Sequence, residues 1–184
     1  MASAVVGAMV STGTSMMMQS ACAEKPDWTA LENQTTQSIG MLEDQLSNLV
    51  GPGGQFQKKG QTIEKGRDIA TTTQLHEGSV NVKNTIKENK NMVNNLGFAS
   101  SGTLDADLND KLIDINNSVN DKFSQINFAT NKQWNDLEEQ RFQTIGAMER
   151  EMNSILAQYA GTTGDAYSGT TIDFTGAYDY NLRG

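Results

Sequence analysis

The sequence predicts an all-α, elongated fold of helical hairpins with one long helix. Pro occurs only twice in 184 residues, so little interrupts helix formation. Apolar residues recur at steps of three and four in several separate stretches, which is the spacing of one helix face. The hydrophobic fraction is 36%, below the ~45–50% of ordinary globular domains, and this argues against a thick core.

The composition also excludes several kinds of site. A single Cys cannot form an internal disulfide, and one Cys with one His cannot hold zinc within one chain. The single His leaves little material for a Ser-His-Asp site. A one-carboxylate enzyme such as a small lytic transglycosylase stays as an alternative, with Glu138, Glu139 and Glu149 as its only candidates. We expect a protein without catalytic activity and without a cofactor.

Residues 1–23 carry no charge and form the first predicted segment. Small residues recur there every fourth position, at Ser3, Gly7, Ser11 and Ser15. Because small residues at this spacing let helix backbones approach closely, we expect an apolar N-terminal helix that packs in a ring or acts on a membrane. A secretory signal peptide is the alternative, but no Lys or Arg precedes the apolar stretch.

Residues 24–160 form the predicted helical region, with hinges at 51–54 and 97–103. The spacing of the apolar residues predicts helices over 27–50 and 74–96. Gly51-Pro52-Gly53-Gly54 ends the first helix. Gly97 and Gly102 bound the second turn, and residues 55–73 stay undecided because Gly and Thr lower their helix propensity.

A long helix is predicted over residues 104–159, which contain no Pro and a single Gly. At 1.5 Å per residue, about 56 residues span about 84 Å, far more than an ordinary globular helix. Its apolar stripe ends in Ile145, Met148, Met152 and Ile155. We expect other subunits of a homo-oligomer to bury this stripe, because the chain supplies only two shorter partner helices.

Residues 161–184 change character to an irregular segment rich in Gly, Thr and aromatic residues. Tyr167, Phe174, Tyr178 and Tyr180 are spaced along it. Aromatic side chains contribute much of the energy of binding interfaces, so these four residues are predicted to dock the tail.

Charge is unevenly distributed in a chain of net charge −8. Residues 51–95 hold seven Lys and Arg against four acids, whereas residues 96–160 hold ten acids against five bases. This pattern favours charge matching between helices or subunits. Direct DNA contact through Lys58, Lys59, Lys65 and Arg67 is the alternative.

The order of these segments resembles that of the small internal core proteins, or ejection proteins, of short-tailed bacteriophages. The shared features are the uncharged small-residue N-terminus, a helix pair hinged on the Gly- and Ser-rich turn between Gly97 and Leu104, a long polar helix and a polar tail. The resemblance implies a homo-oligomeric ring near the portal inside the capsid, with the portal and other core proteins as partners and indirect contact with packaged DNA.

In that family the protein leaves the particle at infection and helps to form a conduit for DNA through the host envelope, so the host membrane is a further implied partner. The family implies no catalytic residues. Two alternatives stay open: a secreted helical component resembling the minor pilins of type IV secretion systems, and another structural virion or tail-connector protein.

Overall fold

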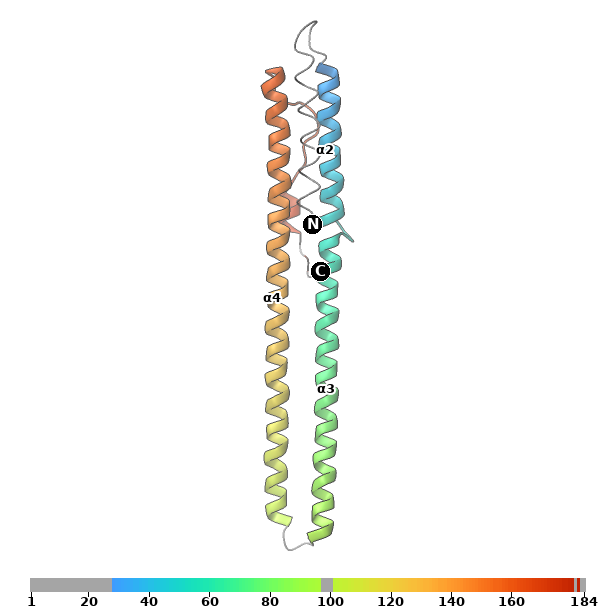
Figure 1. Cartoon of the computed structure of the whole chain (residues 1–184), viewed down its shortest axis with the longest axis vertical. Coiled ribbons are helices and arrows are strands. Elements are labelled where there is room, and N and C mark those ends of the chain that lie inside the picture. Colours follow the sequence, from blue (N-terminus) through green and yellow to red (C-terminus); the bar gives the residue numbers. More distant parts are fainter. Residues whose placement is uncertain (1–27, 97–100, 181, 183–184) are drawn as a thin grey trace. The chain divides into compact units, whose positions relative to one another are not determined.

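The computed structural model describes residues 28–96, 101–180 and 182. Within these residues four helices follow one another: α2 (Trp28–Val50), α3 (Gln55–Leu96), α4 (Ser101–Thr163) and the short α5 (Thr175–Asp179) (Figure 1). The described residues contain no strand, so the all-α prediction is confirmed. The predicted ridge of Ser3, Gly7, Ser11 and Ser15 lies outside the described residues, as does Gly97.

The chain divides into two compact units. Of the described residues, unit 1 contains 28–44 and 149–172, and unit 2 contains 45–96, 101–148, 173–180 and 182. Each unit therefore joins segments that are far apart in the sequence, and α2 and α4 contribute to both.

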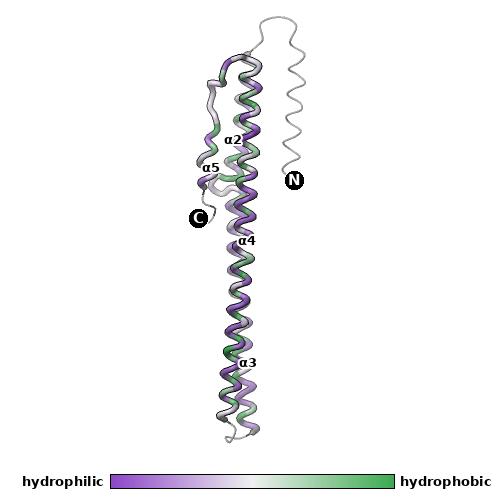
Figure 2. Tube along the Cα trace, turned by 90° about the vertical axis from the view of Figure 1, so that its left-hand side faces the viewer, coloured by the Kyte–Doolittle hydropathy of each residue, from purple (hydrophilic) through white to green (hydrophobic). Residues whose placement is uncertain are grey.

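Unit 2 is built on an antiparallel hairpin of α3 and residues 101–148 of α4 (Figure 1). Its register is visible at three levels. Trp134 Nε1 donates to Glu64 Oε1 at 2.8 Å, Lys122 Nζ lies 3.6 Å from Glu77 Oε2, and Asn89 Nδ2 donates to the Leu104 carbonyl at 3.4 Å. Short hydrophobic and hydrophilic stretches alternate along both helices (Figure 2), as expected where one face of each helix is covered.

The inward positions of α4 follow an eleven-residue repeat of steps four, four and three. Each is buried or half-buried and its neighbours are more exposed. In unit 2 these positions are Leu104, Leu108, Leu112, Ile115, Val119, Phe123, Ile126, Thr130, Trp134, Leu137, Arg141, Ile145 and Met148. Eleven residues over three turns give about 3.67 residues per turn, close to the 3.6 of a free helix, so the seam needs little supercoiling to stay continuous.

The inward positions of α3 follow the same repeat with smaller and more polar residues. They are Phe56, Gly60, Ile63, Arg67, Thr71, Gln74, Gly78, Val82, Thr85, Asn89 and Val93. A Cβ on Gly78 would lie 2.8 Å from Val119 Cγ2, and one on Gly60 would lie 2.6 Å from Trp134 Cη2. The undecided residues 55–73 are helical, and Gly60 within them leaves the room that the Trp134 ring of α4 occupies.

In unit 1, residues 28–44 of α2 accompany residues 149–163 of α4 and the first part of the tail. Ile39, Leu42 and Met152 are buried. Gly164 takes φ of +78° after the last helical residue, and its N–H donates to the Ala160 carbonyl at 2.8 Å. This is a common way for a helix to end, and glycine adopts it without strain.

The structure corrects two predicted boundaries and confirms one. The break at 51–54 is confirmed between α2 and α3. The second turn is shorter than predicted, because α4 begins at Ser101 and Gly102 is helical, so Gly102 is no hinge residue. The tail begins later than residue 161, because α4 continues to Thr163.

The predicted need for other subunits along the apolar stripe is also wrong. Ile145 is 0% exposed, Met148 and Met152 are each 6% exposed, and Ile155 is half-buried, all within a single chain. The prediction underestimated how much cover the chain itself provides.

Candidate functional site

The most elaborate group of side chains in unit 2 is the place where the tail packs on the hairpin. We call it the tail clasp and define it by Gly60 of α3, by Trp134, Arg141 and Phe142 of α4, and by tail residues 173–180 and 182. Three apolar tail residues, Phe174, Ala177 and Leu182, are buried there. A Cβ on Gly60 would lie 3.3 Å from the Leu182 carbonyl, so only a glycine fits between the tail and Trp134.

Arg141 holds the backbone of the tail. Its guanidinium donates from Nη2 to the Tyr178 carbonyl at 3.1 Å and from Nη1 to the Tyr180 carbonyl. The residue is only 5% exposed, and its Nε has no hydrogen-bond partner among the described residues. Burying a charge costs free energy unless the charge is hydrogen-bonded, and the two carbonyls offset this cost for Arg141. The same two hydrogen bonds anchor the end of α5 on α4.

Aromatic contacts add to the clasp. The rings of Phe142 and Tyr178 stack with centroids 5.7 Å apart and planes 15° from parallel. The Arg141 guanidinium carbon lies 4.9 Å from the centroid of Phe142. Stacked aromatic pairs contribute about 0.5–1.5 kcal/mol beyond burial alone.

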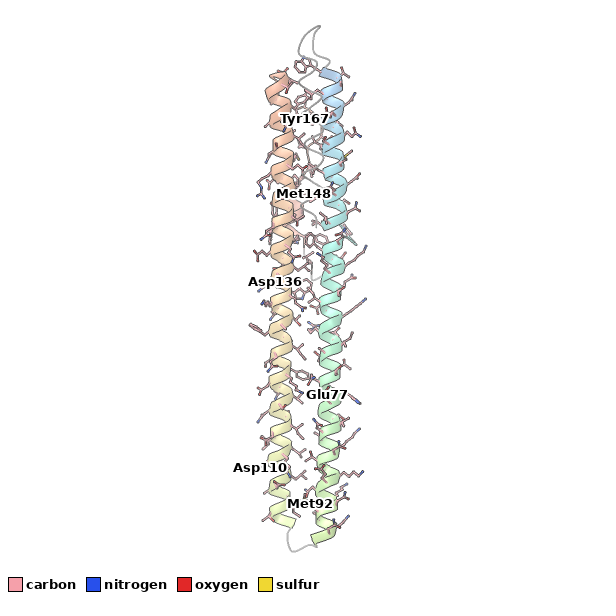
Figure 3. All side chains as sticks on the ribbon, in the orientation of Figure 1. Glu77, Met92, Asp110, Asp136, Met148 and Tyr167 are labelled. Atoms are coloured by element: carbon pink, nitrogen blue, oxygen red, sulfur yellow. The ribbon has the colours of Figure 1, made fainter. Side chains whose placement is uncertain are left out.

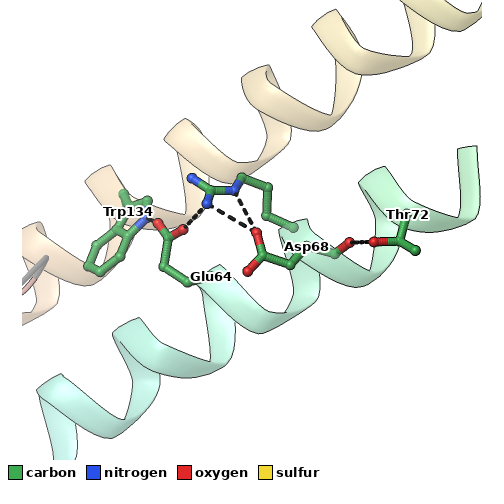
Figure 4. A network of polar contacts seen from close by, with 5 residues as sticks. Glu64, Asp68, Thr72 and Trp134 are labelled. Atoms are coloured by element: carbon green, nitrogen blue, oxygen red, sulfur yellow. Dashed lines mark hydrogen bonds and ion pairs between the residues drawn. The ribbon is translucent and has the colours of Figure 1, made fainter. Parts of the chain in front are cut away.

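Trp134 connects the clasp to a polar network on α3 (Figure 4). Trp134 is 2% exposed, and the Glu64 carboxylate that accepts its indole N–H also pairs with Arg67 Nη2 at 2.7 Å. Arg67 Nη2 lies 3.1 Å from Asp68 Oδ1, and the Asp68 carbonyl accepts from Thr72 Oγ1 at 2.8 Å. The network gives the buried indole its partner and fixes the register of α3 against α4.

The network changes the interpretation of the basic candidates for DNA contact. Arg67 occupies an inward position and is paired with two carboxylates of its own helix. Lys58, Lys59 and Lys65 are exposed, and the Lys59 Nζ lies 5.5 Å from the Phe56 ring centroid. Arg67 therefore acts as a structural residue. The three lysines lie on the surface, as direct contact with DNA requires.

The four predicted docking residues of the tail divide between the two units. In unit 1, Tyr167 shares a hydrogen bond of 2.8 Å with Thr36 Oγ1 and meets Tyr159 edge-to-face at 5.3 Å. In unit 2, Phe174 is buried, Tyr178 stacks on Phe142, and Tyr178 and Tyr180 offer their carbonyls to Arg141. The structure packs the tail on its own chain, a surface that the prediction of docking residues had left open.

The described residues hold no group of three His, Cys, Asp or Glu side chains able to bind a metal ion. None of the helices among them is long and apolar enough to cross a membrane. Asp136, on the outer side of α4 (Figure 3), and Glu139 are exposed, and Glu139 accepts a hydrogen bond from Gln143 at 2.9 Å. The clasp holds the tail against the hairpin of unit 2.

Sequence reasoning missed Arg141 and Trp134. Both fall on the four-four-three repeat of α4, so a charged residue at an apolar position was the available signal for Arg141. Comparison of the chain with protein-family models, with characterised proteins and with solved structures found no match.

Proposed function

We propose that this chain is an internal core protein of a short-tailed bacteriophage, which forms a homo-oligomeric ring near the portal. At infection it leaves the particle and helps to form a conduit for DNA through the host envelope. The observation that supports the proposal best is the hairpin of α3 and residues 101–148 of α4, with its thin seam. A two-helix hairpin is slender, and a thin core is inexpensive to unfold, as passage through a narrow portal and tail requires.

The seam far from the tail clasp supports the same proposal. From Leu104 to Ile126 the inward residues of α4 are half-buried, and none of them is buried. The opposing α3 positions include Thr71, Gln74 and Asn89, and Gln74 Oε1 is a buried atom without a hydrogen-bond partner. Partial cover and an unsatisfied polar atom both lower local stability, so this part of the hairpin opens first.

The partners proposed for the chain are further copies of itself, other core proteins, the portal and the host membrane. Residues 1–23 are proposed as the membrane-active part, with Ser3, Gly7, Ser11 and Ser15 giving close helix contact. Packaged DNA is proposed to lie near the exposed Lys58, Lys59 and Lys65 without a site built for it.

The N-terminus of the mature chain tests the proposal against its main alternative. Intact-mass spectrometry of the protein from its native source is expected to show an uncleaved N-terminal segment and recovery in purified particles. Cleavage near Ala23, with recovery outside the cell, would instead identify an exported protein such as a pilin-like subunit.

A vesicle assay tests the membrane step with the full chain. We expect dye release from anionic lipid vesicles, and we expect Gly7→Leu to abolish it, because a bulky side chain blocks close helix contact although it adds hydrophobicity. Val5→Leu, which adds bulk off the ridge, is the matched control. Equal release by both variants would remove the proposed role of the ridge.

A further inference from the structure

One side of the hairpin is covered by the tail near the clasp and uncovered beyond it. We define the asparagine flank by Leu75 and Ile86 of α3 and by Asn116, Asn120, Asn127 and Asn131 of α4. The four asparagines are exposed, Leu75 is 55% exposed and Ile86 is half-buried. The eleven-residue repeat places these six residues on one side of the hairpin.

The repeat shows that the tail and the asparagine flank share this side of the hairpin. Phe142, which stacks on Tyr178 of the tail, lies eleven residues after Asn131 and twenty-two after Asn120. Residues eleven apart lie above one another on a helix of this period. On α3, Leu75 and Ile86 continue at the same steps from Glu64, which meets Trp134 in the clasp. The tail therefore covers the start of a surface whose remainder is the asparagine flank.

The opposite side of the hairpin differs in its charges. Glu77 of α3 pairs with Lys122 of α4 at 3.6 Å, and Asp107 pairs with Lys111 at 2.6 Å. The hydrogen bond and charge of Asp107, with a smaller effect of Glu88, hold the pKa of Lys111 above its ordinary value. On this side charges are matched within the chain, whereas the four asparagines of the flank are uncharged and lie beside two apolar side chains. The repeat also places Asp105 and Lys90 on the flank's side, nearer to the α3–α4 turn.

We infer that the asparagine flank pairs with the same flank of a second copy of this chain, with the two hairpins antiparallel. An amide side chain both donates and accepts hydrogen bonds, so a row of asparagines is complementary to an identical row. A two-fold interface requires this self-complementarity. The proposed function includes association of the chain with further copies of itself. The inference rests on that one part of the proposed function and names the surface that associates.

The position of the tail decides the direction of pairing. Because the tail already covers the flank next to Trp134, a second copy has access only to the part between the clasp and the α3–α4 turn. Parallel hairpins would bring two tails against each other, whereas antiparallel hairpins overlap through their uncovered parts and leave both tails outside the contact.

The size of the uncovered part suits a reversible pair. An overlap of about 23 residues is about 35 Å long, and two adjacent helices are about 18 Å wide, which gives about 600 Å² per copy. The total of about 1,200 Å² is at the lower limit of specific interfaces, so we expect association that depends on concentration in the micromolar range.

Sedimentation equilibrium of the full chain tests the pairing. We expect the wild type to shift with concentration from its 20.0 kDa monomer toward twice that mass. Asn120→Lys is expected to weaken association at least 10-fold, whereas Asn117→Lys, an exposed asparagine three residues away on the outer side of the same helix, leaves it unchanged. A wild type that stays monomeric at all concentrations, or equal effects of both substitutions, would overturn the inference.

A second pair of variants keeps the test valid if either lysine variant loses helicity by circular dichroism. Leu75→Glu is expected to weaken association and Ile69→Glu is not, although Ile69 is the more exposed of the two at 69%. Equal behaviour of these two variants would also overturn the inference.

The direction of pairing is measured with a spin label at Asn94→Cys in a Cys22→Ser background. Antiparallel hairpins place the two labels about 40 Å apart at a rise of 1.5 Å per residue. A separation below about 20 Å would contradict antiparallel pairing. None of these results depends on particles or vesicles, so failure of the pairing is distinguishable from failure of the virion proposal.

Discussion

Two halves of the same hairpin in unit 2 have the same repeat and different cover. In the half with the tail clasp, which we call the covered half, Trp134, Leu137 and Ile145 are 2%, 4% and 0% exposed. In the open half, residues 104–126 of α4 with 71–93 of α3, the equivalent apolar positions are half-buried. Two helices alone leave their seam accessible from both sides, and the tail supplies the third layer. The comparison of the two halves shows that the hairpin has a buried core where the tail, a segment distant in the sequence, packs on it.

The largest expected effect comes from the centre of the covered half. Trp134→Ala removes a buried indole and its hydrogen bond to Glu64, so we expect a loss of about 3–5 kcal/mol in the free energy of unfolding. Phe128→Ala, on the same helix at 74% exposure, is the control and should change it by less than about 0.5 kcal/mol. Urea unfolding measures both, and similar losses would show that burial does not distinguish these positions.

A pair of identical substitutions compares the two halves directly. Leu137→Ala in the covered half should cost about 2–5 kcal/mol, because it opens a cavity in a closed core. Leu112→Ala in the open half should cost only about 1–2 kcal/mol, because that side chain keeps part of its contact with water in the folded state. Equal losses in the two variants would contradict the contrast in cover.

Loss of the tail's anchor should make the covered half resemble the open half. Arg141→Met keeps the length of the side chain and removes the donors to the Tyr178 and Tyr180 carbonyls, which we expect to cost about 2 kcal/mol. Limited proteolysis is expected to cleave residues 173–182 much faster than in the wild type, with far-UV circular dichroism nearly unchanged. Lys132→Met, an exposed cation on the same helix, should leave the tail protected.

The smallest effect is expected outside the hairpin, at Glu151 in unit 1. Burial raises the pKa of the Glu151 carboxyl, so the folded state binds this proton more tightly than the unfolded state does. The stabilising contribution is therefore present at acid pH and is lost as pH rises through the raised pKa. Glu151→Gln should gain stability relative to the wild type as pH rises from 4 to 7. A difference independent of pH in urea titrations would contradict the assignment.

The sequence predicted the helices well because their signal is local. Pro and Gly at 51–54 and the apolar spacing of α2 and α4 reflect constraints within a few residues. The prediction left residues 55–73 undecided, because helix propensity is a local property and does not depend on what the helix packs against. Gly60 and Gly78 are favourable only because Trp134 and Val119 stand opposite them.

The pairing of partners in the tail clasp could not be predicted, because the clasp joins parts of the chain separated by dozens of residues. The aromatic residues of the tail were identified as docking groups, but nothing local showed that Arg141 would receive the carbonyls of Tyr178 and Tyr180. For the same reason the cover of Ile145 was assigned to other subunits. A charged residue within an otherwise apolar repeat is the pattern by which such an anchor could be found in advance.

The most direct test of the central claim, that the packed tail makes the covered half more stable than the open half, is hydrogen exchange of the free, monomeric protein. We predict that amides of residues 130–148 exchange at least about 10-fold more slowly than those of residues 104–126, which corresponds to about 1.4 kcal/mol. In Arg141→Met this difference should largely disappear through faster exchange of residues 130–148. Uniform protection from 104 to 148, unchanged by Arg141→Met, would contradict the account.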